Sequence, residues 1–161
     1  MVVSELSAVA FVPSQTAPVL KLLQKLGLDR GKLFLDLGSG DGRMVIAACL
    51  KFGCRGVGIE INPLLIIWSK LRTKRQGATN AEFIWGSFWN QDWGRADYIY
   101  CYLSPKAMPK VASKFLREGK GGAILISKAF VANLLKKYLI GQIVTNGRKM
   151  FVYQKIPHCT S

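Results

Sequence analysis

The segment LFLDLGSGDGR, at positions 33–43, restricts the possible folds of this chain more than any other, because it runs from apolar residues through an acid into spaced glycines. Residues 33–37 have the length and apolar character of a short buried strand. The glycines that follow, Gly38, Gly40 and Gly42, permit a tight turn into a helix. The sequence therefore predicts a strand, a loop whose backbone can approach a ligand closely, and a helix.

The acids in and after this loop indicate which ligand it binds. Dinucleotide-binding loops have the spacing G-x-G-x-x-G, whereas this loop reads D-x-G-x-G-x-G and places Asp36 and Asp41 near the ligand. Two carboxylates would repel a pyrophosphate but suit a ligand that carries an ammonium and a sulfonium. A second predicted strand ends in Glu60, an acid that can accept hydrogen bonds from both ribose hydroxyls. The predicted cofactor is S-adenosyl-L-methionine.

Length and composition predict one domain over residues 1–161, without a separate substrate-recognition module. No apolar run approaches the ~20 residues of a membrane span, so we expect no membrane insertion. The start of the chain has no basic region before an apolar stretch and no arginine before Arg30, which favours a cytoplasmic location. The four cysteines form no C-x-x-C pair and there is one histidine, so no metal site is predicted.

The chain is strongly basic, with 23 Lys and Arg against 9 acids and a net charge of +14. Such a field can attract nucleic acid or acidic proteins, and the sign of the charge does not choose between them. Lys106, Lys110, Lys114 and Arg117 recur at three- or four-residue steps and would share one helix face. This face is either simply solvated or a binding surface, and the sequence does not specify an oligomeric state.

Predicted helices and strands alternate along the chain. Apolar periodicity, glycines and prolines predict helices at 16–26, 44–52, 63–76 and 106–117, and strands at 33–37, 56–60, 81–85, 96–103 and 123–127. Such alternation predicts an α/β, Rossmann-like, mainly parallel sheet with helices on both faces. The tail differs, because Asn146-Gly147 between apolar runs at 138–145 and 149–156 predicts a type I′ hairpin. A C-terminal antiparallel hairpin would therefore close the sheet.

Four segments carry a resemblance to a known family: FVPSQTAPVLKLL, LDLGSGDGRMVIAA, GVGIEINPLL and YLSPKAMPKV. Together they resemble the class I, seven-strand methyltransferases, and among these the broad-specificity archaeal protein lysine methyltransferase and its mitochondrial relatives, which modify the adenine nucleotide translocase and the ATP synthase c-subunit. The likeness runs from about Phe11 to Ile156. It implies methyl transfer from S-adenosylmethionine to lysine side chains of proteins, with broad selectivity.

The resemblance also implies roles for individual residues. The turn Gly38, Ser39 and Gly40 would wrap the methionine part of the cofactor, with Asp36 toward its amino group. Glu60 would hold the ribose and Ile61 would pack against adenine. Many class I enzymes place an acid after the third strand, but this chain has WGSFW there. The Ser87 hydroxyl and the backbone N–H of Phe88 are the predicted substitutes.

The N-terminal segment, residues 1–27 with its helix, would fold over the cofactor as a lid in the resembling family. Ser14 and Thr16 can donate hydrogen bonds to the cofactor carboxylate. Both residue types also commonly cap helices, so the two roles stay open.

The segment YLSP, at 102–105, would follow the fourth strand on the methyl-acceptor side, with Tyr102 and Ser104 as candidate catalytic residues. An N/D-P-P-Y/F turn for planar amines is missing here, as is a Pro-Cys nucleophile, which disfavours base methylation. Tyr102, Phe88, Trp89 and Phe11 can line an apolar channel that desolvates a lysine. No dedicated base is required to deprotonate the lysine.

The alternative functions are an RNA or DNA methyltransferase and a non-catalytic nucleic-acid-binding protein that retains the fold.

Overall fold

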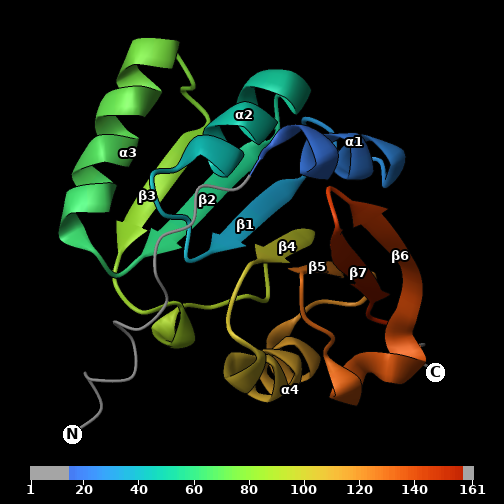
Figure 1. The fold of residues 1–161 in the computed structure, drawn as a ribbon. Helices are drawn as coiled ribbons and strands as arrows, with labels where there is room; N and C mark the ends of the chain where they lie inside the picture. The colour runs from blue at the N-terminus through green and yellow to red at the C-terminus, as the bar shows by residue number, and fades with distance from the viewer. Residues whose placement is uncertain (1–14, 158–161) are drawn as a thin grey trace, which may run out of the picture.

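The computed structural model describes residues 15–157 as one continuous seven-stranded sheet flanked by helices (Figure 1). The α-helices are α1 (Ala17–Lys25), α2 (Arg43–Phe52), α3 (Pro63–Gln76) and α4 (Met108–Glu118). The strands are β1 (Leu33–Leu37), β2 (Arg55–Glu60), β3 (Ala81–Trp85), β4 (Tyr98–Cys101), β5 (Ile124–Lys128), β6 (Leu139–Thr145) and β7 (Arg148–Gln154). Three short 3-10 helices are η1 (Phe88–Asn90), η2 (Pro105–Ala107) and η3 (Asn133–Tyr138).

The strand order is β3-β2-β1-β4-β5-β7-β6. The first five strands in this order pair in parallel, whereas β7 lies antiparallel between β5 and β6. The order reverses between β1 and β4, and in open α/β sheets ligands bind at the carboxyl ends of the strands beside such a reversal. The predicted class I methyltransferase fold is confirmed.

Helices cover both faces of the sheet, α1 to α3 on one side and α4 on the other (Figure 1). Side chains of the central strands alternate between two core clusters. The α1–α2 cluster includes Leu23, Phe34, Ile46, Tyr98 and Ile126. The α4 cluster includes Leu37, Trp93, Ile99, Phe115 and Leu125. Because both faces are covered, β4 is buried at every position, as expected of a parallel strand.

Most predicted elements lie where the sequence indicates. The Asn62 side chain accepts a hydrogen bond from Leu64 N and caps α3, as its position before Pro63 suggests. Asn146 and Gly147 have φ values of 51° and 73°, as a type I′ turn requires. The fourth strand is shorter than predicted, because the chain turns through Ala96, whose N–H donates to Trp93 O, before pairing begins.

Candidate functional site

The glycine loop between β1 and α2 is a left-handed turn at all three glycines. Gly38, Gly40 and Gly42 have φ values of 78°, 57° and 75°, which side chains rarely tolerate. A Cβ at Gly42 would lie 2.5 Å from Phe83 Cζ, whereas a Cβ at Gly38 would meet only Leu103 Cδ2, at 3.6 Å. Gly42 is therefore required for packing beneath the loop, while Gly38 faces space beside the segment that follows β4.

Asp36, the acid in β1, is buried near the carboxyl end of this strand, with 4% of its surface exposed. Its neighbours on the adjacent strands are Gly58 in β2 and Tyr100 in β4. Burial without a counter-charge, together with repulsion from Glu60 and Asp41, raises the pKa of Asp36 to about 8. A cationic group placed here would stabilise the ionised carboxylate. The structure thus puts Asp36 beside the loop, where the sequence predicts it to face an ammonium.

Glu60 is the last residue of β2, and its carboxylate hydrogen-bonds both to the glycine loop after β1 and to the segment after β2. Its Oε2 accepts a hydrogen bond from Gly40 N at 2.9 Å, and its Oε1 accepts from Ile61 N and Asn62 N, each at 2.9 Å. The side chain of Ile61 next to it is 41% exposed. An acid and an exposed apolar side chain therefore lie together at the end of β2, and their contacts with ribose and adenine stay predictions.

Ser39 is the remaining predicted residue of the loop. Its Oγ is buried and has no hydrogen-bond partner within residues 15–157. A Cβ on Gly58 would lie 2.6 Å from this Oγ and 2.7 Å from the Phe83 ring, so the hydroxyl faces the α1–α2 cluster beneath the loop.

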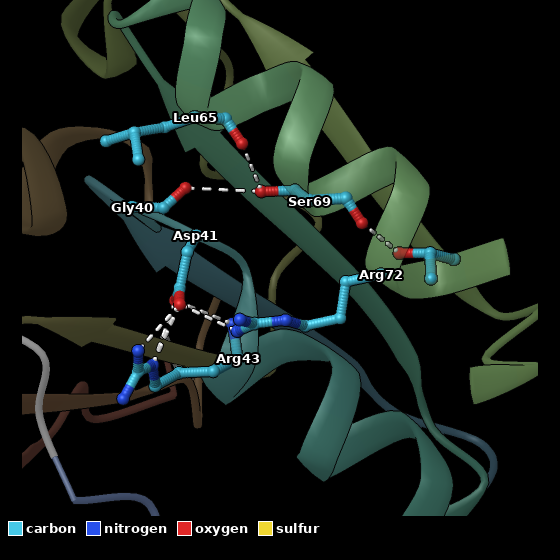
Figure 2. Close-up of polar contacts among 7 residues, drawn as sticks. Gly40, Asp41, Arg43, Leu65, Ser69 and Arg72 are labelled. Atoms are coloured by element: carbon cyan, nitrogen blue, oxygen red, sulfur yellow. Dashed lines mark hydrogen bonds and ion pairs between the residues drawn. The ribbon is translucent and has the colours of Figure 1, made fainter. Parts of the chain in front are cut away.

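Asp41 does not face the ligand side, which corrects the expectation from the sequence. Its carboxylate accepts hydrogen bonds from Arg43 Nη2 and Arg72 Nη1, both at 2.7 Å (Figure 2). Side-chain hydrogen bonds from these arginines hold the pKa of Asp41 below its ordinary value although burial opposes the shift. Asp41 therefore anchors the loop to α2 and α3, and Asp36 and Glu60 remain as the carboxylates beside the glycine turn.

Ser69 and Arg72, which the sequence analysis did not assign to the site, bind the loop from α3. Ser69 Oγ donates to Gly40 O at 3.2 Å and to Leu65 O at 2.8 Å (Figure 2). Their spacing of three residues places them on one helix face, and a serine in the middle of an otherwise apolar helical run was the available indication. The loop is therefore attached to α3 through Ser69 and, by way of Asp41, through Arg72.

Ser87 and Phe88 follow β3 next to the end of β2, since Gly86 N donates to Glu60 O at 2.9 Å. The Ser87 hydroxyl accepts a hydrogen bond from Trp89 N at 3.3 Å and caps η1. The Phe88 ring lies 4.6 Å from the Trp89 ring and packs against the α4 cluster. Their contact with adenine stays a prediction, and in the structure the Ser87 hydroxyl has a capping role.

Thr16 precedes α1, and its side chain makes no capping hydrogen bond. It lines an open groove of about 570 Å³ with Gln15, Ala17, Arg43 and Arg72, beside the anchored Asp41. Thr16 therefore lies beside the two arginines that bind Asp41 of the glycine loop, and its hydroxyl does not cap α1. Residues 1–14 of the predicted lid, Ser14 among them, lie outside the described residues.

Tyr102 and Ser104 follow β4 across the switch point from the glycine loop. Two cationic side chains lie over the Tyr102 ring: Lys128 Nζ is 5.2 Å and Arg148 Cζ is 5.4 Å from the ring centroid. Burial lowers the pKa of Lys128. Ser104 precedes η2 and makes no capping hydrogen bond with its side chain. The face of this ring is thus a site where an ammonium group is stabilised.

The predicted aromatic channel is not assembled as expected. Tyr102 packs against the α1–α2 cluster, whereas Phe88 and Trp89 pack against the α4 cluster on the other side of the sheet. Alternation of side chains along β4 and the turn into η1 explain this separation. Tyr102 therefore shares no cluster with Phe88 and Trp89, and Phe11 lies outside the described residues.

The predicted basic face of α4 also needs correction. Lys114 is buried, 6% exposed, and its Nζ donates to Glu118 at 2.6 Å while it lies 5.1 Å above the Trp93 ring. Lys110 Nζ lies 4.3 Å above the Trp89 ring. Arg117 pairs with Glu118 at 2.9 Å. Lys110 and Lys114 therefore contact tryptophans and Lys114 is withdrawn from the predicted face, whereas Lys110 and Arg117 remain exposed. Lys106 is also exposed but lies in η2 and not in α4.

Within residues 15–157, no cluster of three His, Cys, Asp or Glu side chains could hold a metal ion. No helix in this described part of the chain combines the length and apolar character needed to cross a membrane.

Comparison with known proteins agrees with this geometry. The profile of the family described as ANTKMT methyltransferase domain matches residues 36–137. The chain is 36% identical over 121 residues to an ATP synthase c-subunit lysine N-methyltransferase of Rattus norvegicus, covering 74% of this chain and 55% of that protein. It is 28% identical over 124 residues to a protein-lysine N-methyltransferase of Saccharolobus islandicus, covering 76% and 77%.

Among solved structures, an RNA methyltransferase from Salinibacter ruber in complex with S-adenosyl-L-homocysteine superposes with a TM-score of 0.84. The two chains are 29% identical, and the match covers 93% of this chain and 97% of that one. The chain spans about half the length of the ATP synthase c-subunit methyltransferases that it matches.

Proposed function

The chain belongs to the ANTKMT methyltransferase domain family, and on that premise we propose that it transfers methyl groups from S-adenosyl-L-methionine to the side-chain amines of lysine residues in proteins. Relatives whose names state lysine N-methylation support the substrate class. The observation that carries the proposal is the placement of two carboxylates, Asp36 and Glu60, on either side of a left-handed glycine turn.

The residues present fit this cofactor. Its ammonium would stabilise the ionised form of Asp36, whose pKa is raised to about 8 by burial and by the nearby Glu60 and Asp41. Glu60 and Ile61 would hold ribose and adenine. The cofactor supplies an electrophilic methyl group on a good leaving group, so the protein needs chiefly to bind and orient.

A lysine must lose its proton at the acceptor side before its nitrogen can attack the methyl group. At pH 7 this costs roughly 4.6 kcal/mol for an amine with a reference pKa of about 10.4. Lys128 and Arg148 next to Tyr102 make the surroundings cationic, which lowers the pKa of an incoming amine, as does its desolvation. The Tyr102 ring would orient the side chain, and Ser104 lies at the start of η2, where its hydroxyl can accept a hydrogen bond from the amine. No carboxylate or histidine base is needed.

A second candidate, RNA methylation, is favoured by the similarity to the Salinibacter ruber protein and by the net charge of +14. The two functions are separated by one experiment. Purified protein and cofactor with a labelled methyl group are incubated with a nuclease-treated protein fraction and, separately, with a protein-free RNA fraction. Label on lysine, identified by mass spectrometry, is expected. Label confined to RNA would replace the proposal, and Asp36→Ala serves as the inactive control.

A further inference from the structure

The solvent-facing side of α3 is apolar, whereas a surface helix normally directs polar residues outward. Leu64, Ile67, Trp68 and Leu71 recur at helical spacing and are 66%, 55%, 57% and 52% exposed. Single exposed apolar side chains are common, but a continuous row of four on one helix usually marks a contact surface.

The opposite side of α3 explains why these residues stay outside. The side that faces the sheet carries Ser69, which donates to Gly40 O, and Thr73, whose Oγ1 donates to Ser69 O at 2.8 Å. Arg72 pairs with Asp41 at 2.7 Å. Rotating the apolar row inward would break the contacts of Ser69 and Arg72 with the loop. The row is therefore held outward by the attachment of α3 to the glycine loop.

Two neighbouring side chains extend the row to the edge of the sheet. Trp85 lies on the edge strand β3, is 66% exposed and donates its indole N–H to Ile61 O at 3.0 Å. Figure 1 shows α3 and β3 together at the end of the molecule opposite β6. The resulting α3 patch consists of Ile61, Leu64, Ile67, Trp68, Leu71 and Trp85.

Charge selects among the possible occupants of this patch. Lys70, Lys74 and Arg75 are exposed on the same helix, and α3 contains no acid. A second copy of this chain would bring these cations together, in a molecule whose net charge is already +14. An anionic lipid surface offers both an apolar layer and negative headgroups. Helices that lie in the membrane interface typically combine leucine and tryptophan on one face with neighbouring lysine and arginine.

We propose that the α3 patch docks this protein peripherally on an anionic membrane surface. The apolar row and Trp85 enter the boundary between headgroups and acyl chains, and Lys70, Lys74 and Arg75 contact the phosphates. The molecule lies on the bilayer by this face and does not cross it. This docking needs neither cofactor nor methyl acceptor, so its test is independent of the proposed lysine methylation.

The test is co-sedimentation of the full chain with vesicles of phosphatidylcholine, with and without phosphatidylglycerol. We expect binding to the anionic vesicles that weakens with salt, with a blue shift of tryptophan fluorescence. Leu64→Gln with Leu71→Gln should weaken binding by at least about tenfold, because two apolar side chains leave the bilayer. Lys74→Glu with Arg75→Glu should weaken it by about tenfold or more at low salt.

Matched controls change residues of the same type outside the patch. Leu50 on α2 is 51% exposed, and Lys21 and Lys25 are exposed on α1. Leu50→Gln and Lys21→Glu with Lys25→Glu should bind vesicles more tightly than the corresponding patch variants, and thermal unfolding should show that all variants fold. Absence of binding by the wild type, or equal losses in patch and control variants, would overturn the proposal. So would a dimer in sedimentation velocity that Leu64→Gln with Leu71→Gln dissociates, since a second copy would then cover the patch.

Discussion

Glu60 Oε2 lies 2.9 Å from Gly40 N and accepts its hydrogen, so a side chain that ends β2 fixes the backbone of the loop that follows β1. The other carboxylate oxygen accepts from Ile61 N and Asn62 N. One acid therefore orients both loops that would surround a nucleoside. Its contribution to cofactor binding combines direct hydrogen bonds with positioning of the glycine turn.

Glu60→Ala should weaken binding of S-adenosylhomocysteine by about 1.5 to 3 kcal/mol, the cost of losing hydrogen bonds to a charged group. Isothermal titration calorimetry measures this change directly. Glu82→Ala is the matched control, because that acid is exposed and its contact with Arg55 spans 3.5 Å. Unchanged affinity in Glu60→Ala, or an equal loss in Glu82→Ala, would contradict the assignment of Glu60.

The buried carboxyl of Asp36 should make stability depend on pH. Because its pKa is raised to about 8, the folded protein keeps a proton that the unfolded chain releases above about pH 4. The resulting stabilisation is complete below the unfolded pKa and is lost as the pH rises through 8, with a slope of at most about 1.4 kcal/mol per pH unit.

Denaturant unfolding of wild type and Asp36→Asn between pH 5 and 8 checks this sign. The free energy of unfolding of Asp36→Asn should rise relative to that of the wild type as the pH increases, because the amide cannot ionise. Saturating S-adenosylhomocysteine should reduce the wild-type slope, since its ammonium would stabilise the ionised form. Parallel pH profiles for the two proteins would show that Asp36 is ionised throughout.

Two glycines of the loop should respond differently to alanine, although both have positive φ. Gly38→Ala adds strain of about 1 to 2 kcal/mol but finds space, since its Cβ would meet only Leu103 Cδ2, at 3.6 Å. The variant should fold and lose cofactor affinity. Gly42→Ala places its Cβ 2.5 Å from Phe83 Cζ and should lose about 3 kcal/mol or more of stability. Thermal unfolding and calorimetry together separate the two effects, and equal stabilities would contradict the packing role of Gly42.

The elements and the glycine loop were predictable because their determinants are local. Strand-length apolar runs, spaced glycines and the cap Asn62 before Pro63 each act within a few residues. The partner of Asp41 was not predictable in the same way, because Arg72 lies 31 residues further along the chain. Only the packing of α3 on the loop brings the two together.

The face of α4 shows a different reason for error. Lys114 and Glu118 stand at i and i+4, so their ion pair was available from the sequence. Trp93, which lies over Lys114, comes from a separate segment, and its approach depends on the fold. On α3 the helix boundaries match the prediction, but the apolar run from Leu64 to Trp68 did not reveal which side chains would face outward.

The ring of Tyr102 already holds Lys128 Nζ at 5.2 Å and Arg148 Cζ at 5.4 Å, so it attracts cations without a substrate. If the ring orients the substrate lysine by the same attraction, Tyr102→Phe should retain much of kcat/KM and Tyr102→Ala should lose most of it, because phenylalanine keeps the π face. Steady-state methylation of one defined protein substrate measures both variants, with S-adenosylhomocysteine affinity as the check that the cofactor site is intact.

A different ranking of the variants would identify a different role for Tyr102. If the phenol removes the proton from lysine, Tyr102→Phe and Tyr102→Ala should be about equally inactive, and the pH–rate profile of the residual activity should shift upward toward the ionisation of free lysine. Full activity in both variants would assign Tyr102 to packing against the α1–α2 cluster. Lys128→Met tests the orienting role further. It removes a cation that competes with the substrate for the Tyr102 ring, so KM for the lysine substrate should fall. Lys21→Met, on the exposed face of α1, is the control and should leave KM unchanged.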